Sequence, residues 1–264
     1  MLIDSHAHLD YDYELSTEEL LAAAKAAGVQ RVIAIAAAPD SLERVRELAE
    51  KFPQVYFTSG VHPHDSKDFT EAIFSSIKSL SAHPKCVAVG ELGLDYFYDH
   101  SDHETQHKAL EAQLRFSAEI GKPVVVHTRD ADADTLKFLK PHSRDFQAKH
   151  PGKAPGVIHC FTGTANLAEE ALALGYYISF SGILTFKNAE PLRAVARDIV
   201  PMEKLLVETD SPFLAPIPHR GKKNQPAYTR LVAEKVAELK GLSLEEVARQ
   251  TVANTERLFS IPKQ

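Results

Sequence analysis

The chain has 264 residues, of which 44% are hydrophobic and 25% are charged. This composition supports a sizeable packed core and excludes a disordered or collagen-like protein. The 36 acidic and 30 basic residues give a formal net charge of −6, so there is no overall basic surface for holding duplex nucleic acid nonspecifically.

The cysteine count and the apolar runs indicate a cellular compartment. Only two cysteines are present, which excludes a disulfide scaffold and fits a reducing environment. No apolar run approaches the roughly 18 residues of a membrane span, and the first residues do not resemble a signal peptide. We therefore expect a cytoplasmic protein without a membrane partner. The 13 histidines are the feature left to explain.

Short apolar runs recur along the chain, and each is suited to a strand that is buried on both faces. These predicted strands cover residues 2–3, 31–37, 55–58, 86–89, 123–126, 156–158, 176–180 and 204–207. Their centres lie about 29 residues apart, a spacing that accommodates one strand and one helix per unit.

Helical periodicity appears between these runs and after the last one. It is clearest at residues 42–52, 73–80, 167–174 and 228–239, and a final helix is expected to end with residues 251–259. Capping boxes are predicted at Ser16 with Glu19 and at Ser243 with Glu246. Gly28, Gly121, Gly175 and Gly241 follow helical stretches, as C-terminal capping glycines do.

The alternation of strands and helices predicts an α/β protein with a parallel sheet, either open or closed. The first predicted strand is not followed by a glycine-rich phosphate loop, which argues against an open dinucleotide-binding sheet. Eight units favour a closed (β/α)8 TIM barrel. Because no linker or composition shift divides the chain, we expect a single domain over residues 1–264.

Side chains that bind metals follow the predicted strands, at positions that share the carboxyl-terminal rim of a barrel. They are His6, His8, His62, His64, Glu91, His127, His159 and Asp210. Histidine and carboxylate are borderline or hard metal ligands. The rim is therefore the predicted functional site.

The spacing of these residues predicts two cation sites. His6 and His8 are two residues apart at a strand end, so they should point to the same side. Glu91 suits a carboxylate that bridges two cations, although an Arg or Lys partner would also explain a buried acid there. His127 and His159 supply nitrogens for the second cation, although either one alone could be a core histidine.

Asp210 completes the predicted ligand set and is also the predicted proton acceptor from metal-bound water. Its alternative role is to cap the turn that begins at Ser211 and Pro212. Glu208, two residues earlier, should face the same way and is a rival ligand. Two cations that share a carboxylate generate hydroxide near neutral pH, so the sequence predicts a hydrolase. The cations are Mg²⁺, Mn²⁺ or Zn²⁺, and the mixed ligand set leaves that choice open.

Seven motifs in order along the chain resemble the TatD-related metal-dependent deoxyribonucleases of the amidohydrolase-like TIM barrels. They lie at residues 3–10 (IDSHAHLD), 60–64 (GVHPH), 90–95 (GELGLD), 126–129 (VHTR), 158–161 (IHCF), 208–212 (ETDSP) and 220–226 (RGKKNQP). The resemblance implies a two-metal site and hydrolysis of DNA phosphodiesters, commonly as a 3′ to 5′ exonuclease. It also implies a barrel of the metallo-dependent hydrolase type, with His62 and His64 near the scissile phosphate. The six metal ligands that it implies are His6, His8, Glu91, His127, His159 and Asp210.

Basic and aromatic residues on the predicted rim loops are candidate substrate contacts. Arg129 and Arg220 are expected to reach flanking phosphates, whereas Lys222 and Lys223 fit a solvated loop better than a dedicated phosphate clamp. The aromatic residues 96–98 suit either stacking on an unpaired base or lid packing. Because the chain is acidic overall, we expect single-stranded or 3′ ends of DNA as the partner rather than long duplex, with no obligate protein partner.

Two other functions fit the same residues. A dinuclear centre also hydrolyses carboxylic esters or amides, including aminoacyl esters on tRNA, because its hydroxide attacks a carbonyl carbon equally well. A noncatalytic barrel that binds nucleic acid is the other alternative, but an open set of ligands argues against it.

Overall fold

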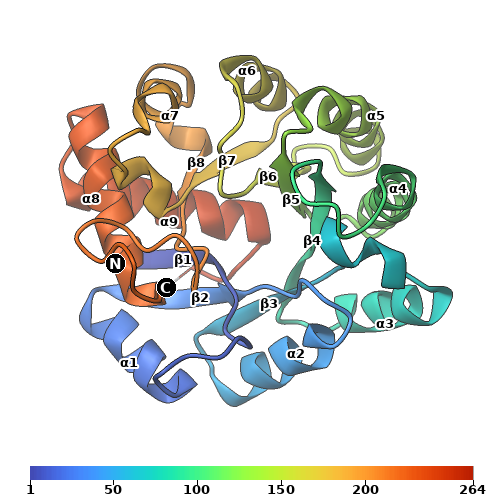
Figure 1. Cartoon of the computed structure of the whole chain (residues 1–264), viewed down its shortest axis with the longest axis horizontal. Coiled ribbons are helices and arrows are strands. Elements are labelled where there is room, and N and C mark those ends of the chain that lie inside the picture. The colour runs from blue at the N-terminus through green and yellow to red at the C-terminus, as the bar shows by residue number, and fades with distance from the viewer. Residues whose placement is uncertain (264) are drawn as a thin grey trace.

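The computed structural model describes residues 1–263 and contains one eight-stranded parallel sheet with the strand order β1 to β8. The strands are β1 (Leu2–Ala7), β2 (Val29–Ala34), β3 (Val55–Ser59), β4 (Cys86–Asp95), β5 (Val124–Arg129), β6 (Gly156–Ile158), β7 (Tyr177–Phe180) and β8 (Leu205–Val207). Each predicted strand is present, and Figure 1 shows the strands arranged in a ring inside a ring of helices.

The barrel closes between β1 and the segment that follows β8. The Asp210 N–H donates to the His6 carbonyl at 2.9 Å, and the His8 N–H donates to the Ser211 carbonyl at 2.8 Å. Ala7 and Ser211 form a parallel bridge between these two bonds. The predicted (β/α)8 barrel is therefore confirmed, and its closing seam passes through predicted site residues.

Helices surround the barrel in the order that the sequence predicts. They are α1 (Thr17–Ala26), α2 (Ser41–Lys51), α3 (Glu71–Ser81), α4 (His103–Ile120), α5 (Asp132–Lys149), α6 (Ala165–Ala173), α7 (Glu190–Ala194), α8 (Thr229–Lys240) and α9 (Leu244–Phe259). Both predicted capping boxes are formed, at Ser16 with Glu19 and at Ser243 with Glu246. None of the helices in residues 1–263 has the length and hydropathy needed to span a membrane.

Several strand boundaries differ from the predicted ones, and the differences concern the site. β1, β4 and β5 continue past their apolar runs, so that His6, Glu91 and His127 lie within strands rather than after them. β4 and β5 continue because they pair with each other beyond their apolar runs, as far as Asp95 with Arg129. β2 instead ends at Ala34, because the chain turns into α2 through hydrogen bonds from the backbone N–H groups of residues 37 and 38 to the Ser41 hydroxyl.

Consecutive strand residues alternate between two hydrophobic clusters. Val32 and Val124 belong to the cluster between strands and helices, whereas Ile33 and Val125 belong to the cluster inside the barrel. The inner cluster also contains Leu258, Phe259 and Ile261 from the end of α9 and the residues after it. The end of α9 thus covers the amino-terminal end of the barrel, and the site lies at the opposite end (Figure 1).

Candidate metal centre

Six side chains with metal-binding atoms converge at the carboxyl-terminal end of the barrel. They come from β1 and its end (His6, His8), β4 (Glu91), β5 (His127), the end of β6 (His159) and the segment after β8 (Asp210). The structure therefore brings together all six residues that the sequence singled out as ligands, although the first and the last are more than 200 residues apart.

Glu91 lies at the centre of this cluster because β4 is irregular there. The register of β4 against β5 shifts between Val89 and Leu92, as in a β-bulge. The Glu91 N–H leaves the regular ladder and donates to the Ala36 carbonyl at 2.8 Å. The bulge turns the Glu91 carboxylate into the barrel mouth, where the residue is only 2% exposed.

One set of donor atoms surrounds a single point beside Glu91. This set consists of four atoms: His6 Nε2, His8 Nε2, Glu91 Oε2 and Asp210 Oδ1. Five of the distances between them are 3.3 to 3.8 Å. Four ligands placed tetrahedrally at about 2.0–2.1 Å from a cation would be about 3.3–3.4 Å apart. The spacing of this set therefore fits a shared cation.

A second set lies on the other oxygen of Glu91. His127 Nδ1 is 3.3 Å and His159 Nε2 is 2.7 Å from Glu91 Oε1. The opposite ring nitrogens face carboxylates: His127 Nε2 is 3.0 Å from Asp95, and His159 Nδ1 is 3.2 Å from Glu208. A carboxylate that accepts the far N–H of a histidine leaves the near nitrogen free to bind a metal.

Glu208 and Asp210 contact different groups, although strand alternation predicts that they face the same way. Glu208 Oε1 accepts the Cys160 N–H at 2.7 Å and lies behind His159. Asp210 has a φ of 56°, so the backbone leaves the extended conformation on which the alternation depends. Glu208 still lies close enough to His6 and His159 for the three to offer a cation one ligand atom each, all within 4.8 Å.

Asp210 does not act as the turn cap that the sequence offered as an alternative. Its side chain contacts His6 and His8, and the turn at Pro212 is closed by the Phe213 N–H donating to the Asp210 backbone carbonyl at 3.0 Å. Burial opposes ionisation, but hydrogen bonding with His8 lowers the pKa of Asp210 below its ordinary value. The carboxylate is therefore ionised at neutral pH.

His62 has the hydrogen-bonding pattern of a proton donor rather than a metal ligand. Its Nδ1 accepts the His64 backbone N–H at 3.1 Å, which uses the one ring lone pair of a neutral imidazole. Burial holds the pKa of His62 well below its ordinary value, so the ring is neutral and its proton is on Nε2. This Nε2–H lies 3.4 Å from Glu91 Oε1 and faces the cluster.

His64 lies farther from Glu91, at the edge of the cluster. Its Nε2 is 3.0 Å from Asp95 Oδ2, the same oxygen that faces His127. Asp95 Oδ1 accepts the backbone N–H groups of Phe97 and Tyr98. One buried carboxylate thus fixes two histidines and the loop beside them.

Buried polar atoms without partners show that the residues fit bound cations. Glu91 Oε2 and His159 Nε2 are buried and have no hydrogen-bond partner of suitable geometry, although His159 Nε2 lies 2.7 Å from Glu91 Oε1. Burial disfavours the Glu91 anion, but the charge of the neighbouring His159 holds its pKa well below the ordinary value. An ionised carboxylate surrounded by imidazole nitrogens has the donor chemistry of a Zn²⁺, Mn²⁺ or Mg²⁺ site.

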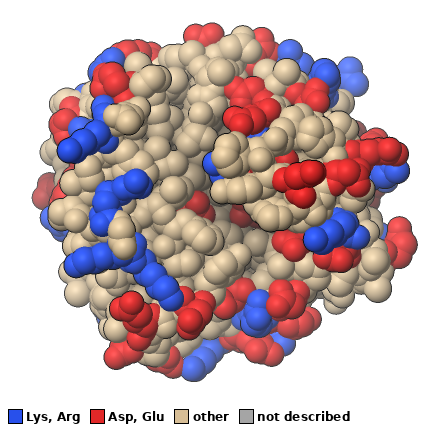
Figure 2. Space-filling model, viewed as in Figure 1, with Lys and Arg blue, Asp and Glu red and all other residues tan. Residues whose placement is uncertain are grey.

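The cluster lines the floor of a cavity of about 380 Å³ that opens on this face. Figure 2 shows acidic atoms at the bottom of the central depression, and Lys and Arg side chains gathered to its left, over the segment that follows β8. Arg129 lines the cavity, with its guanidinium 3.9 Å from the Phe97 ring centre. Arg220 instead lies 3.7 Å from the ring centre of Phe186, outside the lining of this cavity.

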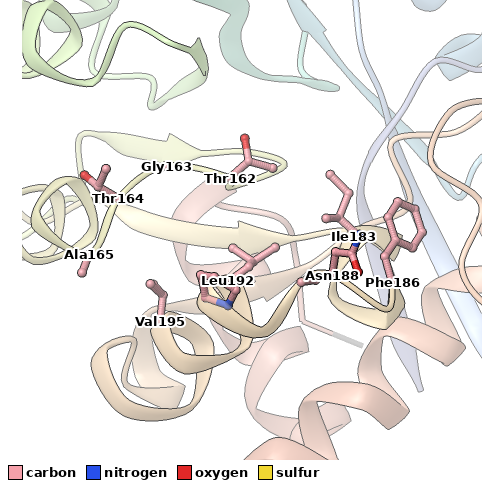
Figure 3. Close-up of a pocket in the computed structure, with 11 residues that line it drawn as sticks. Thr162, Gly163, Thr164, Ala165, Ile183, Phe186, Asn188, Leu192 and Val195 are labelled. Carbon is pink, nitrogen blue, oxygen red and sulfur yellow. The ribbon is translucent and has the colours of Figure 1, made fainter.

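A second groove, of about 440 Å³, lies beside the mouth. Figure 3 shows that its lining comes from the loop after β6, the segment after β7 and the α7 region. Its side chains are apolar or small and polar, including Ile183, Phe186 and Leu192, and none of them is titratable. This groove therefore offers no acid, base or metal ligand.

Several residues that the structure places at the site have no role predicted from the sequence. Asp95 was visible only as part of the motif at residues 90–95, and Tyr11 and Phe213 lie in segments without periodicity. Asp4 is buried and accepts the Thr209 N–H and hydroxyl at 2.9 and 2.6 Å, which ties β1 to the segment after β8. Burial raises the pKa of Asp4 to about 7. Only the density of acids near strand ends could have pointed to these acidic residues.

Comparison with known proteins agrees with this geometry. The model of the TatD related DNase family matches residues 3–260. The chain belongs to this family and is a metal-dependent hydrolase. The uncharacterized metal-dependent hydrolase YcfH of Escherichia coli K12 is 46% identical, with 98% of this chain and 96% of YcfH aligned. YabD of Bacillus subtilis, described in the same words, is 41% identical over 99% of this chain and all of YabD.

Two further relatives connect the chain to a nuclease name and to a solved structure. The 3′-5′ ssDNA/RNA exonuclease TatD of Citrobacter rodentium is 37% identical over 92% of each chain. The crystal structure of YJJV, a TatD homologue from Escherichia coli K12, superposes with a TM-score of 0.90 at 31% identity and covers 99% of this chain and 98% of that one. The fold and the family thus agree along the whole chain.

Proposed function

We propose that this protein hydrolyses phosphodiester bonds in DNA and removes nucleotides from the 3′ ends of unpaired strands. The observation that carries the proposal is a buried, ionised Glu91 with histidine nitrogens on both of its oxygens and a neutral His62 donor beside it. The name of the Citrobacter rodentium relative, an exonuclease on single-stranded DNA and RNA, supports the same substrate class.

The residues present would hold two divalent cations. His6, His8, Glu91 and Asp210 would hold one, and Glu91, His127 and His159 would hold the other. Such cations lower the pKa of bound water and neutralise phosphate oxygens. The protein supplies fixed ligands, because Asp95 and Glu208 hold the far sides of two of the rings.

The remaining steps belong to side chains around the reacting phosphate. Asp210 is ionised and lies at the cavity, so it accepts the proton of the attacking water. His62 Nε2–H donates a hydrogen bond to a phosphate or leaving oxygen, since its Nδ1 is already occupied. Arg129 lines the cavity and would contact a flanking phosphate.

The size and charge of the site favour a strand end over a duplex. The cavity holds about 380 Å³, at the small end of the range for ligand pockets. The chain carries a net charge of −6. One group of Lys and Arg side chains lies to the left of the mouth, whereas those on its other sides are interspersed with Asp and Glu (Figure 2). A single strand can lie along one group of basic side chains, whereas a protein that encloses duplex DNA needs a broad basic surface.

The test is digestion of a 5′-labelled single-stranded oligonucleotide by the purified protein with Mg²⁺, Mn²⁺ or Zn²⁺. We expect a ladder that shortens from the 3′ end, abolished by EDTA, with a supercoiled plasmid nicked far more slowly. An aminoacyl ester and a p-nitrophenyl carboxylic ester serve as comparison substrates. Turnover of these esters without cleavage of DNA would overturn the proposal in favour of a carbonyl hydrolase.

A further inference from the structure

Two exposed aromatic side chains stand at the rim of the cavity beside the metal-binding cluster. Tyr11, in the segment after β1, is 43% exposed, and Phe213, in the segment after β8, is 47% exposed. Their ring centres are 5.6 Å apart with the planes near perpendicular, at 79°. The His8 ring lies 5.2 Å from Tyr11 and 5.9 Å from Phe213, so the pair is anchored next to a predicted ligand.

The location of exposed aromatic residues is not random. Within residues 1–263, four large aromatic side chains are exposed: Tyr11, Phe97, Tyr98 and Phe213. Three of them line the 380 Å³ cavity, and the fourth, Phe97, packs on Tyr98 and Arg129 at its edge. Exposing a large aromatic ring to water is unfavourable. The grouping of four exposed rings at one cavity mouth therefore indicates a ligand with a flat apolar face.

The four rings form two walls on different halves of the cluster. Tyr11 and Phe213 stand at His8, which belongs to the first donor set. Tyr98 stands 5.4 Å from His64, near the second donor set, and is covered by the Arg129 guanidinium at 4.8 Å. Arg129 thus already covers part of the Phe97–Tyr98 wall. Among residues 1–263, no Lys or Arg side chain covers the rings of Tyr11 and Phe213 in this way.

We propose that Tyr11 and Phe213 form a subsite that stacks the unpaired nucleobase of one of the two nucleotides flanking the cleaved phosphodiester. This proposal rests on the proposed nuclease function and adds to it the part of the substrate that the protein grips. Every nucleobase has a π face, so stacking holds a strand without reading its sequence. A base inside a duplex has both faces covered by its neighbours, and the subsite therefore selects frayed or single-stranded ends.

The first experiment measures stacking without turnover. A 2-aminopurine base is placed at each of the last three positions of a single-stranded oligonucleotide with phosphorothioate linkages, and its fluorescence is titrated with protein in Ca²⁺. Stacking quenches this base, so we expect quenching by the wild-type protein at one of the two positions that flank the cleavage point. Tyr11→Ala and Phe213→Ala should reduce the quenching, whereas Tyr11→Phe and Phe213→Tyr should retain it.

The second experiment separates a stacking role from a structural one. Loss of one base–aromatic contact should lower kcat/KM on the normal strand about tenfold for each alanine variant. On a strand that is abasic at the stacked position, wild type and both alanine variants should have equal kcat/KM, because no base is present to stack. The matched control is Ile217→Ala, which removes an exposed apolar side chain from the segment containing Phe213 but outside the cavity lining.

The outcomes are distinguishable. An equal loss by the alanine variants on normal and abasic strands would show a structural role and overturn the subsite. DNA cleavage by the wild type without 2-aminopurine quenching at either flanking position would overturn the subsite and leave the nuclease function standing. Ester turnover with neither DNA cleavage nor oligonucleotide binding would overturn the proposed function, and this inference with it.

Discussion

At the scale of single residues, the site depends on three carboxylates that contact different histidines. Glu91 faces histidines on both oxygens, Asp210 faces His6 and His8, and Asp95 faces the outer side of His127. These contacts allow each acid to be tested separately, because a single amide substitution changes one contact set and keeps the side-chain volume.

Asp210→Asn should lower turnover at least about a hundredfold, because the amide cannot take the proton of the attacking water. The measurement is the initial rate on a labelled oligonucleotide at saturating metal, accompanied by metal analysis of the purified variant. Asp12→Asn is the matched control, since the Asp12 carboxylate is fully exposed on the nearby loop. Wild-type turnover by Asp210→Asn would show that another group is the base.

Asp95→Asn should weaken metal binding by about 10- to 100-fold, because Asp95 fixes His127 through its outer nitrogen. Asp95 Oδ1 must accept two backbone N–H groups, so the amide nitrogen of the variant would be directed at His127 and His64. Competition titration against a chelating dye measures the affinity. Asp99→Asn, in the exposed loop after β4, is the control. An unchanged affinity in Asp95→Asn would argue that His127 does not bind the metal.

At the scale of elements, β4 and β5 pack so closely that one glycine is indispensable. Gly93 pairs with His127 and has a φ of +150°, and a Cβ built on it would lie 1.9 Å from the His127 carbonyl oxygen. Gly93→Ala should therefore destabilise the protein by at least ~3 kcal/mol, measured by urea unfolding. Gly152→Ala, where φ is +83° and no atom lies within 4 Å, should cost only about 1–2 kcal/mol.

A buried polar chain links α4, α5 and the start of β7, and it makes stability depend on pH. The Tyr176 hydroxyl donates to His142 Nδ1 at 2.5 Å, His142 Nε2–H donates to the Ser117 hydroxyl, and Ser117 donates to the Lys122 carbonyl. This pattern requires neutral His142, and burial lowers its pKa to about 4. Between pH 6.5 and 4 the unfolded chain therefore binds a proton that the folded chain does not.

Stability should fall as the pH decreases through that window, by up to about 3 kcal/mol from this residue. Unfolding in urea at pH 7.0 and at pH 4.5 measures the change for the wild type and for His142→Gln, which does not titrate. The variant should be less stable at neutral pH and show a smaller decrease. An equal decrease in both proteins would assign the pH dependence to other groups.

The sequence predicts the elements better than it predicts the details that shape the site. Eight apolar runs identify eight strands, because strands buried on both faces must be apolar. The bulge at Gly90 and Glu91 depends on contacts with Ala36, just after β2, and with β5, which the order of residues does not reveal. The apolar criterion also ends β4 too early, since Glu91 and Asp95 are polar residues that are buried for their chemistry.

At the scale of the whole molecule, the centre is a concentration of buried charge that a cation should stabilise. Four carboxylates and four histidines are buried in the cavity and directly behind it: Glu91, Asp95, Glu208, Asp210, His6, His8, His62 and His159. Adding metal at 100 times its Kd to the metal-free protein should contribute ~2.7 kcal/mol. The melting temperature should rise by roughly 5–10 °C, measured by calorimetry with and without EDTA. No shift in the wild type would contradict a metal centre.

The closing seam of the barrel has a consequence for the time at which activity arises. The two hydrogen bonds that join β1 to residues 210 and 211 also set Asp210 beside His6 and His8. During synthesis at about 5–20 residues per second, the first of the proposed ligands, His6 and His8, leave the ribosome long before Asp210 is made. The growing chain therefore cannot form the complete site until most of it has been made. Activity should begin only when the barrel closes and Asp210 reaches His6 and His8.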